Sequence, residues 1–92
     1  MTADSQAPRR LTLLVRAYCH LCDDMRDALA PLAATFGCEV EEIDIDADPV
    51  LEKRWNDLVP VLLAGERELC HYRIDAALVT AFLLDGGGSK SR

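Results

Sequence analysis

Hydrophobic and polar residues alternate along the chain in patterns that predict strands and helices in turn. A nearly continuous apolar run within 10–16 is typical of a strand covered on both faces. Between Leu21 and Phe36 the apolar residues recur at helical spacing, and Gly37 follows as a candidate left-handed C-cap. Polar and apolar residues then alternate over 39–46, which predicts a half-covered second strand. The first half of the chain is therefore expected to form a right-handed β-α-β unit.

The second half of the chain predicts two more strands and two more helices. Asp48 is a candidate N-cap for a second helix, and an apolar third strand follows at 59–63. A turn at 64–67 leads to an antiparallel fourth strand at 68–71, and Asp75 caps a last helix. The order β-α-β-α-β-β-α predicts an α/β fold with a four-stranded mixed sheet flanked by helices on both faces.

The length of the chain allows one small domain. Its 92 residues are 50% hydrophobic, which is typical of a globular protein with a single modest core. We expect that domain to span residues 10–84. The polar residues 1–9 and the glycine- and serine-rich residues 85–92 are expected to be flexible tails.

The charge of the chain argues against two classes of partner. Sixteen acidic and ten basic residues give a net charge of −6, which disfavours a surface for nucleic acid or for an anionic membrane. The first residues lack the apolar core of a secretory signal, and no later run is long enough to span a bilayer. We therefore expect a cytoplasmic monomer whose thiols are kept reduced.

Candidate chemistry lies at the junction between the first strand and the first helix. Cys19 and Cys22 are separated there by His20 and Leu21. A helix start aims unpaired N–H groups and the positive end of the helix dipole at the first sulfur, which favours the reactive thiolate. The pattern predicts that Cys19 attacks a disulfide and that Cys22 resolves the mixed disulfide. His20 is either a donor to that thiolate or an exposed turn residue.

The other two cysteines do not complete a zinc pattern. A closed zinc site normally uses four ligands in two close pairs, whereas Cys38 and Cys70 stand alone in the sequence. We therefore favour redox chemistry and expect no bound metal. Cys38 is expected to be a buried small hydrophobe, and Cys70 either packs in the core or acts as a third redox thiol. Two alternatives stay open: a binding module without turnover, and a metal or iron–sulfur protein that shares a cluster between two subunits.

The element order, the Cys-x-x-Cys motif at the first junction and the Val59-Pro60 pair before the third strand resemble the thioredoxin fold. Within that fold the chain is similar to glutaredoxins, in particular to the small bacterial glutaredoxin-like proteins, over residues 10–84. The resemblance implies that Cys19 is the exposed nucleophile and Cys22 the buried resolving thiol. It also implies a role in cell redox homeostasis, with a disulfide-containing protein or a small thiol as substrate.

The resemblance further implies a binding groove. Pro60 matches a cis-proline, and Val59 before it presents its backbone to an extended thiol substrate. Arg16 matches a basic position that meets a carboxylate of glutathione, the implied co-substrate, and Asp75 matches an acidic position before the last helix. No tightly bound cofactor is implied. The predicted ligand-binding residues are Arg16, Tyr18, His20, Val59, Pro60 and Asp75.

The chain departs from the glutaredoxin pattern at two places. The motif interior is His20-Leu21, where glutaredoxins usually have Pro-Tyr. Bulky His71 and Tyr72 stand in the stretch where glutaredoxins have a glycine pair, which is expected to narrow the groove.

Overall fold

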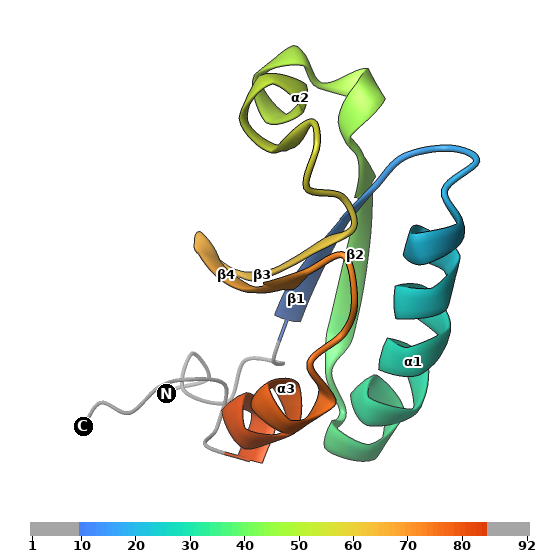
Figure 1. The fold of residues 1–92 in the computed structure, drawn as a ribbon. Coiled ribbons are helices and arrows are strands. Elements are labelled where there is room, and N and C mark those ends of the chain that lie inside the picture. The colour runs from blue at the N-terminus through green and yellow to red at the C-terminus, as the bar shows by residue number, and fades with distance from the viewer. Residues whose placement is uncertain (1–9, 85–92) are drawn as a thin grey trace.

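Strands and helices follow one another in the order that the sequence predicts (Figure 1). The structure, a computed structural model, describes residues 10–84, so the tails expected at 1–9 and 85–92 lie outside the described residues. The elements are β1 (Arg10–Val15), α1 (His20–Phe36), β2 (Glu39–Asp44), the 3-10 helix η2 (Ile45–Ala47), α2 (Pro49–Trp55), β3 (Val61–Ala64), β4 (Arg67–His71) and α3 (Ala76–Leu84). None of the helices within 10–84 has the length and apolar character needed to cross a membrane.

The strands form one mixed sheet in the order β2-β1-β3-β4. β1 and β2 run parallel, whereas β1 pairs antiparallel with β3 and β3 antiparallel with β4. The predicted turn between β3 and β4 is confirmed, because Ala64 pairs with Arg67 around Gly65, whose φ is 63°. The predicted α/β class and mixed four-stranded sheet are thus confirmed.

β1 is buried from both sides, as its continuous apolar run predicts. Leu11 and Leu13 point to one face and pack in the cluster formed with α1 and α3. Leu14 points to the other face, where it packs with Ile45 and with Trp55 of α2. In Figure 1, α1 and α3 lie next to one another, and α2 lies apart from both. Helices therefore cover both faces of the sheet, and Trp55 is a core residue.

α1 carries the regular apolar stripe that its sequence predicts. Gly37 ends the helix in the left-handed conformation, with φ 64° and ψ 38°, so the predicted C-cap is confirmed. The buried residues recur every three or four positions, which places them on one face of the helix: Cys22, Met25, Leu29 and Ala33. This stripe fixes the rotation of α1 about its axis and directs Cys22 toward the sheet.

The second strand is shorter than predicted. The alternation predicts a strand over 39–46, but β2 ends at Asp44 and a single 3-10 turn follows. The carboxylate of Asp44 accepts a hydrogen bond from the backbone N–H of Asp46 at 2.9 Å, and this local bond competes with the strand. Ile45 is fully buried. It occupies an apolar position of the predicted alternation, but it anchors the 3-10 turn and not a strand.

Helix α2 begins where the sequence predicts. Asp48 is its N-cap, and its carboxylate accepts hydrogen bonds from the N–H groups of Val50 at 3.0 Å and Leu51 at 3.2 Å. Pro49 occupies the first helical position, where its missing N–H removes a group that has no partner within a helix.

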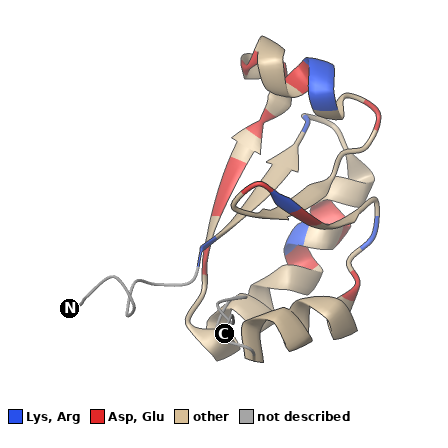
Figure 2. Cartoon of the chain, turned by 90° about the vertical axis from the view of Figure 1, so that its left-hand side faces the viewer, with Lys and Arg blue, Asp and Glu red and all other residues tan. Residues whose placement is uncertain are grey.

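β2 forms an acidic edge of the sheet (Figure 2). Its exposed carboxylates are Glu39, Glu41, Glu42 and Asp44. Arg26 of α1 donates to Glu42 at 2.7 Å and to Asp23 at 2.7 Å, and these hydrogen bonds, the one to Glu42 foremost, raise the pKa of the guanidinium above its ordinary value. The charge along this edge disfavours pairing with a strand of another chain.

The C-cap of α1 gives a stability prediction. Replacing Gly37 by alanine puts a Cβ on a left-handed residue, which costs about 1 to 2 kcal/mol of unfolding free energy. No other atom lies within 4 Å of that Cβ, so the loss is a backbone effect and not a clash. Urea denaturation measures it. Gly37→Asn is the control and is expected to lose less, because asparagine tolerates this conformation. An alanine variant as stable as the parent protein would contradict the assignment.

Candidate active site

Three loops meet at one end of the sheet. Leu14 of β1 pairs with Val61 of β3 in antiparallel strands, so the residues after β1 lie beside the residues before β3. Val61 also pairs with His71 at the end of β4, which brings the residues after β4 to the same end. The three loops are 16–19, 56–60 and 72–75. Strand register alone therefore brings the motif cysteines, the Val59-Pro60 pair and the loop before α3 together.

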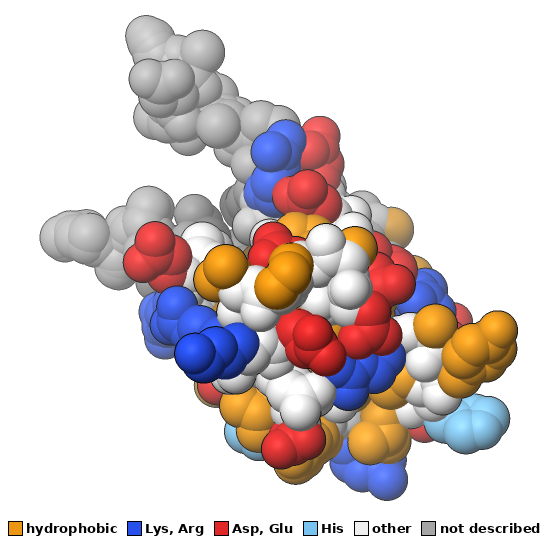
Figure 3. Space-filling model, turned by 90° about the horizontal axis from the view of Figure 1, so that it is seen from above, with side chains coloured by type: hydrophobic (Ala, Val, Ile, Leu, Met, Phe, Trp, Pro, Cys, Tyr) orange, Lys and Arg blue, Asp and Glu red, His pale blue; other side chains and the backbone are white. Residues whose placement is uncertain are grey.

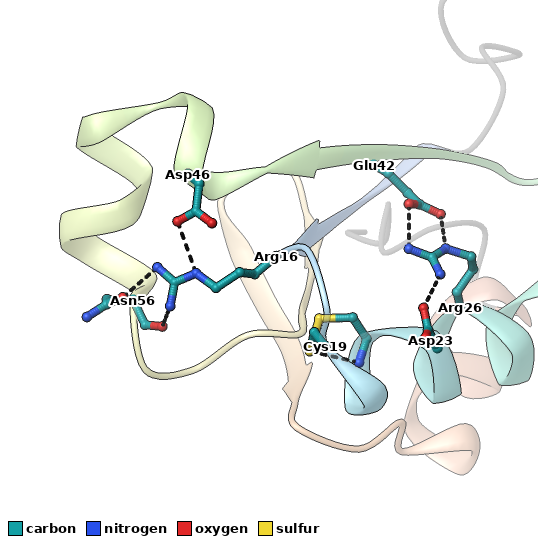
Figure 4. Close-up of a disulfide and its surroundings, with 8 residues drawn as sticks. Arg16, Cys19, Asp23, Arg26, Glu42, Asp46 and Asn56 are labelled. Atoms are coloured by element: carbon teal, nitrogen blue, oxygen red, sulfur yellow. Dashed lines mark hydrogen bonds and ion pairs between the residues drawn. A yellow bond between two sulfur atoms is a disulfide. The ribbon is translucent and has the colours of Figure 1, made fainter.

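The two motif cysteines form a disulfide at the start of α1 (Figure 4). Their Cα atoms are 5.1 Å apart. Cys19 is the N-cap of the helix, and its Sγ accepts a hydrogen bond from the backbone N–H of Cys22 at 3.1 Å. Cys22 has 1% of its surface exposed, whereas Cys19 is partly exposed. The two sulfurs therefore differ in access to solvent, with Cys19 as the accessible one.

This position suits a negatively charged sulfur. The N–H of Cys22 points at the Cys19 sulfur, and this donor and the helix dipole both favour negative charge at that position. Asp23 in the first turn opposes that effect through its own charge. Its carboxylate is paired with Arg26 at 2.7 Å, which partly neutralises it. The local arrangement thus favours a thiolate at Cys19.

Tyr18 and His20 flank Cys19 at the surface. Tyr18 is fully exposed and has a φ of 59°, a left-handed conformation that is uncommon for a residue with a side chain. His20, the first residue of α1, is exposed as well. Neither side chain bonds to any residue within 10–84 in this structure. Seen from above, a histidine side chain lies beside hydrophobic side chains at the edge of the molecule (Figure 3). Both residues are free to contact a ligand, and their predicted roles stay predictions.

The Val59-Pro60 bond is cis, as the resemblance implies. Pro60 is fully buried, and Val59 is half-buried and packs against the same core cluster as Cys19. Among the described residues, none forms a backbone hydrogen bond with the N–H or C=O of Val59. Val59 therefore lies close to the cysteine loop with unpaired backbone groups.

Arg16 has several partners within the protein. The resemblance implies that it meets a carboxylate of glutathione, and that role stays a prediction. In the structure its Nε donates to Asp46 at 3.0 Å and its Nη2 donates to the side chain of Asn56 at 2.7 Å (Figure 4). Glu52 lies 3.5 Å from the same guanidinium. The carboxylates around η2 and α2 hold the guanidinium away from the cysteine pair, so Arg16 joins the cysteine loop to the 56–60 loop.

Asp75 and Cys70 lie at the entry to α3. The carboxylate of Asp75 accepts the backbone N–H of Leu78 at 3.0 Å, so Asp75 caps the helix as predicted, and its predicted contact with a ligand stays a prediction. Cys70 is half-buried, and burial raises the pKa of its thiol, although a hydrogen bond from the Asp75 backbone partly offsets this. Cys38 is buried, as expected. No group of three or more potential metal ligands occurs within 10–84.

Sequence reasoning missed the contacts of Tyr72. Its hydroxyl donates to the backbone carbonyl of Asp57 at 2.8 Å, and its backbone N–H donates to the carbonyl of Pro60 at 2.9 Å. Its φ is 65°. These bonds join residues more than ten positions apart, so no local pattern in the sequence signals them.

The sheet order and the flanking helices define a thioredoxin-like fold. Residues 10–84 match the family model described as "Glutaredoxin-like domain (DUF836)". The chain therefore belongs to this glutaredoxin-like family, and the resemblance inferred from its motifs is confirmed.

The chain is also similar to solved structures and to a curated sequence. A Nitrosomonas europaea protein solved by NMR is 40% identical, covers 82% of this chain and 91% of its own, and has a TM-score of 0.74. An X. campestris protein solved by X-ray is 39% identical, covers 79% and 93%, and has a TM-score of 0.64. An uncharacterized Mycobacterium tuberculosis protein is 31% identical over 71 residues, 72% of this chain and 73% of the relative.

The site predicts an order of thiol reactivity. In the reduced protein at neutral pH, iodoacetamide is expected to alkylate Cys19 before Cys70 and Cys38. Cys19 is accessible and lies at a helix start, Cys70 is half-buried with a raised thiol pKa, and Cys38 is buried. Mass spectrometry of timed samples measures the order. Faster alkylation of Cys70 than of Cys19 would show that the helix start does not activate the first sulfur.

Proposed function

We propose that the chain is a thiol–disulfide oxidoreductase in which Cys19 is the nucleophile and Cys22 the resolving thiol. One observation carries the proposal: Cys19 is the N-cap of α1, and its sulfur accepts the N–H of its own partner, Cys22. This arrangement combines a site for a thiolate with a second sulfur within bonding reach.

The proposed reaction moves two electrons from the dithiol to a substrate disulfide. The Cys19 thiolate attacks one substrate sulfur, forms a mixed disulfide and releases the other substrate sulfur as a thiolate, which takes a proton. The Cys22 thiol then loses its proton and attacks the Cys19 sulfur. The second substrate sulfur leaves as a thiol, and the Cys19–Cys22 disulfide remains. An external dithiol or two molecules of glutathione reverse these steps and restore the reduced protein.

The proposed substrate is a disulfide in an extended peptide segment. The unpaired N–H and C=O of Val59 are suited to pair with the backbone of such a segment next to Cys19. Exposed Tyr18 and His20 flank the sulfur and would meet the residues on either side of the substrate disulfide. A protein disulfide therefore suits this site better than a disulfide without peptide groups.

Glutathione is the small thiol that we propose as a candidate reductant. Two residues that the resemblance assigns to it have partners within the protein, since Arg16 bonds to Asp46 and Asn56 and Asp75 caps α3. Binding of glutathione by these residues would therefore have to compete with existing contacts. Equilibration of the Cys19–Cys22 pair with a glutathione redox buffer measures the reduction potential. A value near that of the glutathione couple supports glutathione as the donor, and a much lower value supports a protein dithiol.

Two cysteine variants test the reaction. Cys19→Ser is expected to abolish reduction of insulin and of bis(2-hydroxyethyl) disulfide, because the attacking sulfur is lost. Cys22→Ser is expected to accumulate mixed disulfides on Cys19, because the buried resolving thiol is lost, and non-reducing mass spectrometry detects them. Cys38→Ala is the control for loss of a cysteine outside the motif and should leave both rates unchanged. Full activity of Cys19→Ser would falsify the assignment, and a protein inactive with every donor would instead favour a binding module.

A further inference from the structure

The 56–60 loop, which carries Val59, is held at both of its ends by bonds from other loops. At its start, Arg16 donates to the backbone carbonyl of Asn56 at 3.4 Å and to its side-chain oxygen at 2.7 Å. At its other end, the carbonyl of Pro60 accepts the N–H of Tyr72 at 2.9 Å. Between these, the Asp57 carbonyl accepts the hydroxyl of Tyr72 at 2.8 Å. Val59 thus lies between two bonds that come from a single residue, Tyr72.

Tyr72 is itself held in one orientation. Its φ of 65° is a left-handed conformation that glycine and asparagine adopt readily and tyrosine rarely does. This backbone geometry accompanies an N–H bonded to Pro60 and a side chain that reaches Asp57. The ring of His71 packs edge-on against the Tyr72 ring with centroids 4.6 Å apart, and His71 bonds to Glu68. Tyr72 is thus bonded to the 56–60 loop through both its backbone N–H and its side-chain hydroxyl, and these two bonds hold it in one conformation across the loop.

We propose that Tyr72 is a positioning residue that fixes the backbone of Val59 for an extended peptide substrate. The inference rests on the function proposed above and deepens it. Tyr72 need not touch the substrate: it holds Asp57 and Pro60, and these hold Val59 between them. The structure thereby assigns a reason for the bulky residue at position 72, where the resemblance implies a small one.

The proposal predicts a dependence on the kind of substrate. A peptide segment has N–H and C=O groups that pair with Val59, so a loosened loop weakens its binding. Bis(2-hydroxyethyl) disulfide has no peptide groups, and its reduction depends only on access to the Cys19 sulfur. Loss of the bond between Tyr72 and the 56–60 loop should therefore weaken the binding of a peptide substrate and leave the reduction of bis(2-hydroxyethyl) disulfide unchanged.

The test is Tyr72→Phe, which removes the hydroxyl bond to Asp57 and keeps the ring. The KM for insulin is expected to rise roughly three- to tenfold, the change that loss of one hydrogen bond produces, with kcat unchanged. Activity toward bis(2-hydroxyethyl) disulfide and the reduction potential of the Cys19–Cys22 pair should not change. The matched control is Arg10→Gln, which removes one exposed bond to Glu39 at the far end of β1 and should leave the KM for insulin unchanged.

A second variant separates the side chain from the backbone conformation. In Tyr72→Asn the new side chain tolerates the left-handed φ, and the backbone N–H that bonds to Pro60 is kept, so this variant should fold. Its KM for insulin should rise at least as much as that of Tyr72→Phe. An insulin KM within twofold of the parent value in both variants overturns the proposal. An equal loss of activity toward both substrates also overturns it, since the change would then lie at the sulfur.

Hydrogen exchange gives a readout that does not need turnover. The amide of Leu58 donates to the carbonyl of Trp55, and the amide of Tyr72 donates to the carbonyl of Pro60. Both amides should exchange faster in Tyr72→Phe than in the parent protein, while the amides of α1 stay the same. If the parent protein reduces neither substrate, the proposed function fails, and this measurement still decides whether Tyr72 fixes the loop. Unchanged exchange at both amides overturns the inference.

Discussion

The candidate active site depends on one hydrogen bond, from the backbone N–H of Cys22 to the sulfur of Cys19. This bond exists because a strand ends and a helix begins within four residues, so that a sulfur takes the place usually filled by a capping oxygen. The apolar stripe of α1 fixes the rotation of the helix, which buries Cys22 and leaves Cys19 at the surface. The geometry of the cysteine pair therefore depends both on the packing of α1 and on the capping of its first turn.

The sheet supplies the surroundings of that bond. β1 and β3 are antiparallel neighbours, and the register Leu14 to Val61 places the loop after one strand against the loop before the other. β4 pairs on the far side of β3 and brings Tyr72 to the same end. Groups from three separate stretches of sequence thus meet without any insertion dedicated to the site. A site without an added segment suits a chain of 92 residues, in which most apolar side chains are needed for the two core clusters.

Local signals in the sequence predicted most of the fold and the cysteine pair at the start of α1. Some contacts join residues within about four positions of one another, and such contacts leave a local pattern in the sequence. They include the caps at Asp48 and Gly37 and the Cys19–Cys22 pair. The contacts of Arg16 and Tyr72 were not predictable in this way. Arg16 bonds to a residue 40 positions away and Tyr72 to one 15 positions away, and their partners depend on register and on where β2 ends. The early end of β2 came from a competition that the alternation does not reveal, between the Asp44 side chain and the strand.

The unequal depth of the two motif sulfurs has a geometric consequence. Because Cys22 lies beneath the first turn of α1, a thiol that arrives from solvent can reach the bond between the cysteines only along the side of Cys19. Opening and closing of that bond then share one path of approach, with the incoming sulfur, Cys19 and Cys22 close to a line. The depth of Cys22 and the helix start at Cys19 act together here, because one limits access to a single sulfur and the other favours negative charge on that sulfur.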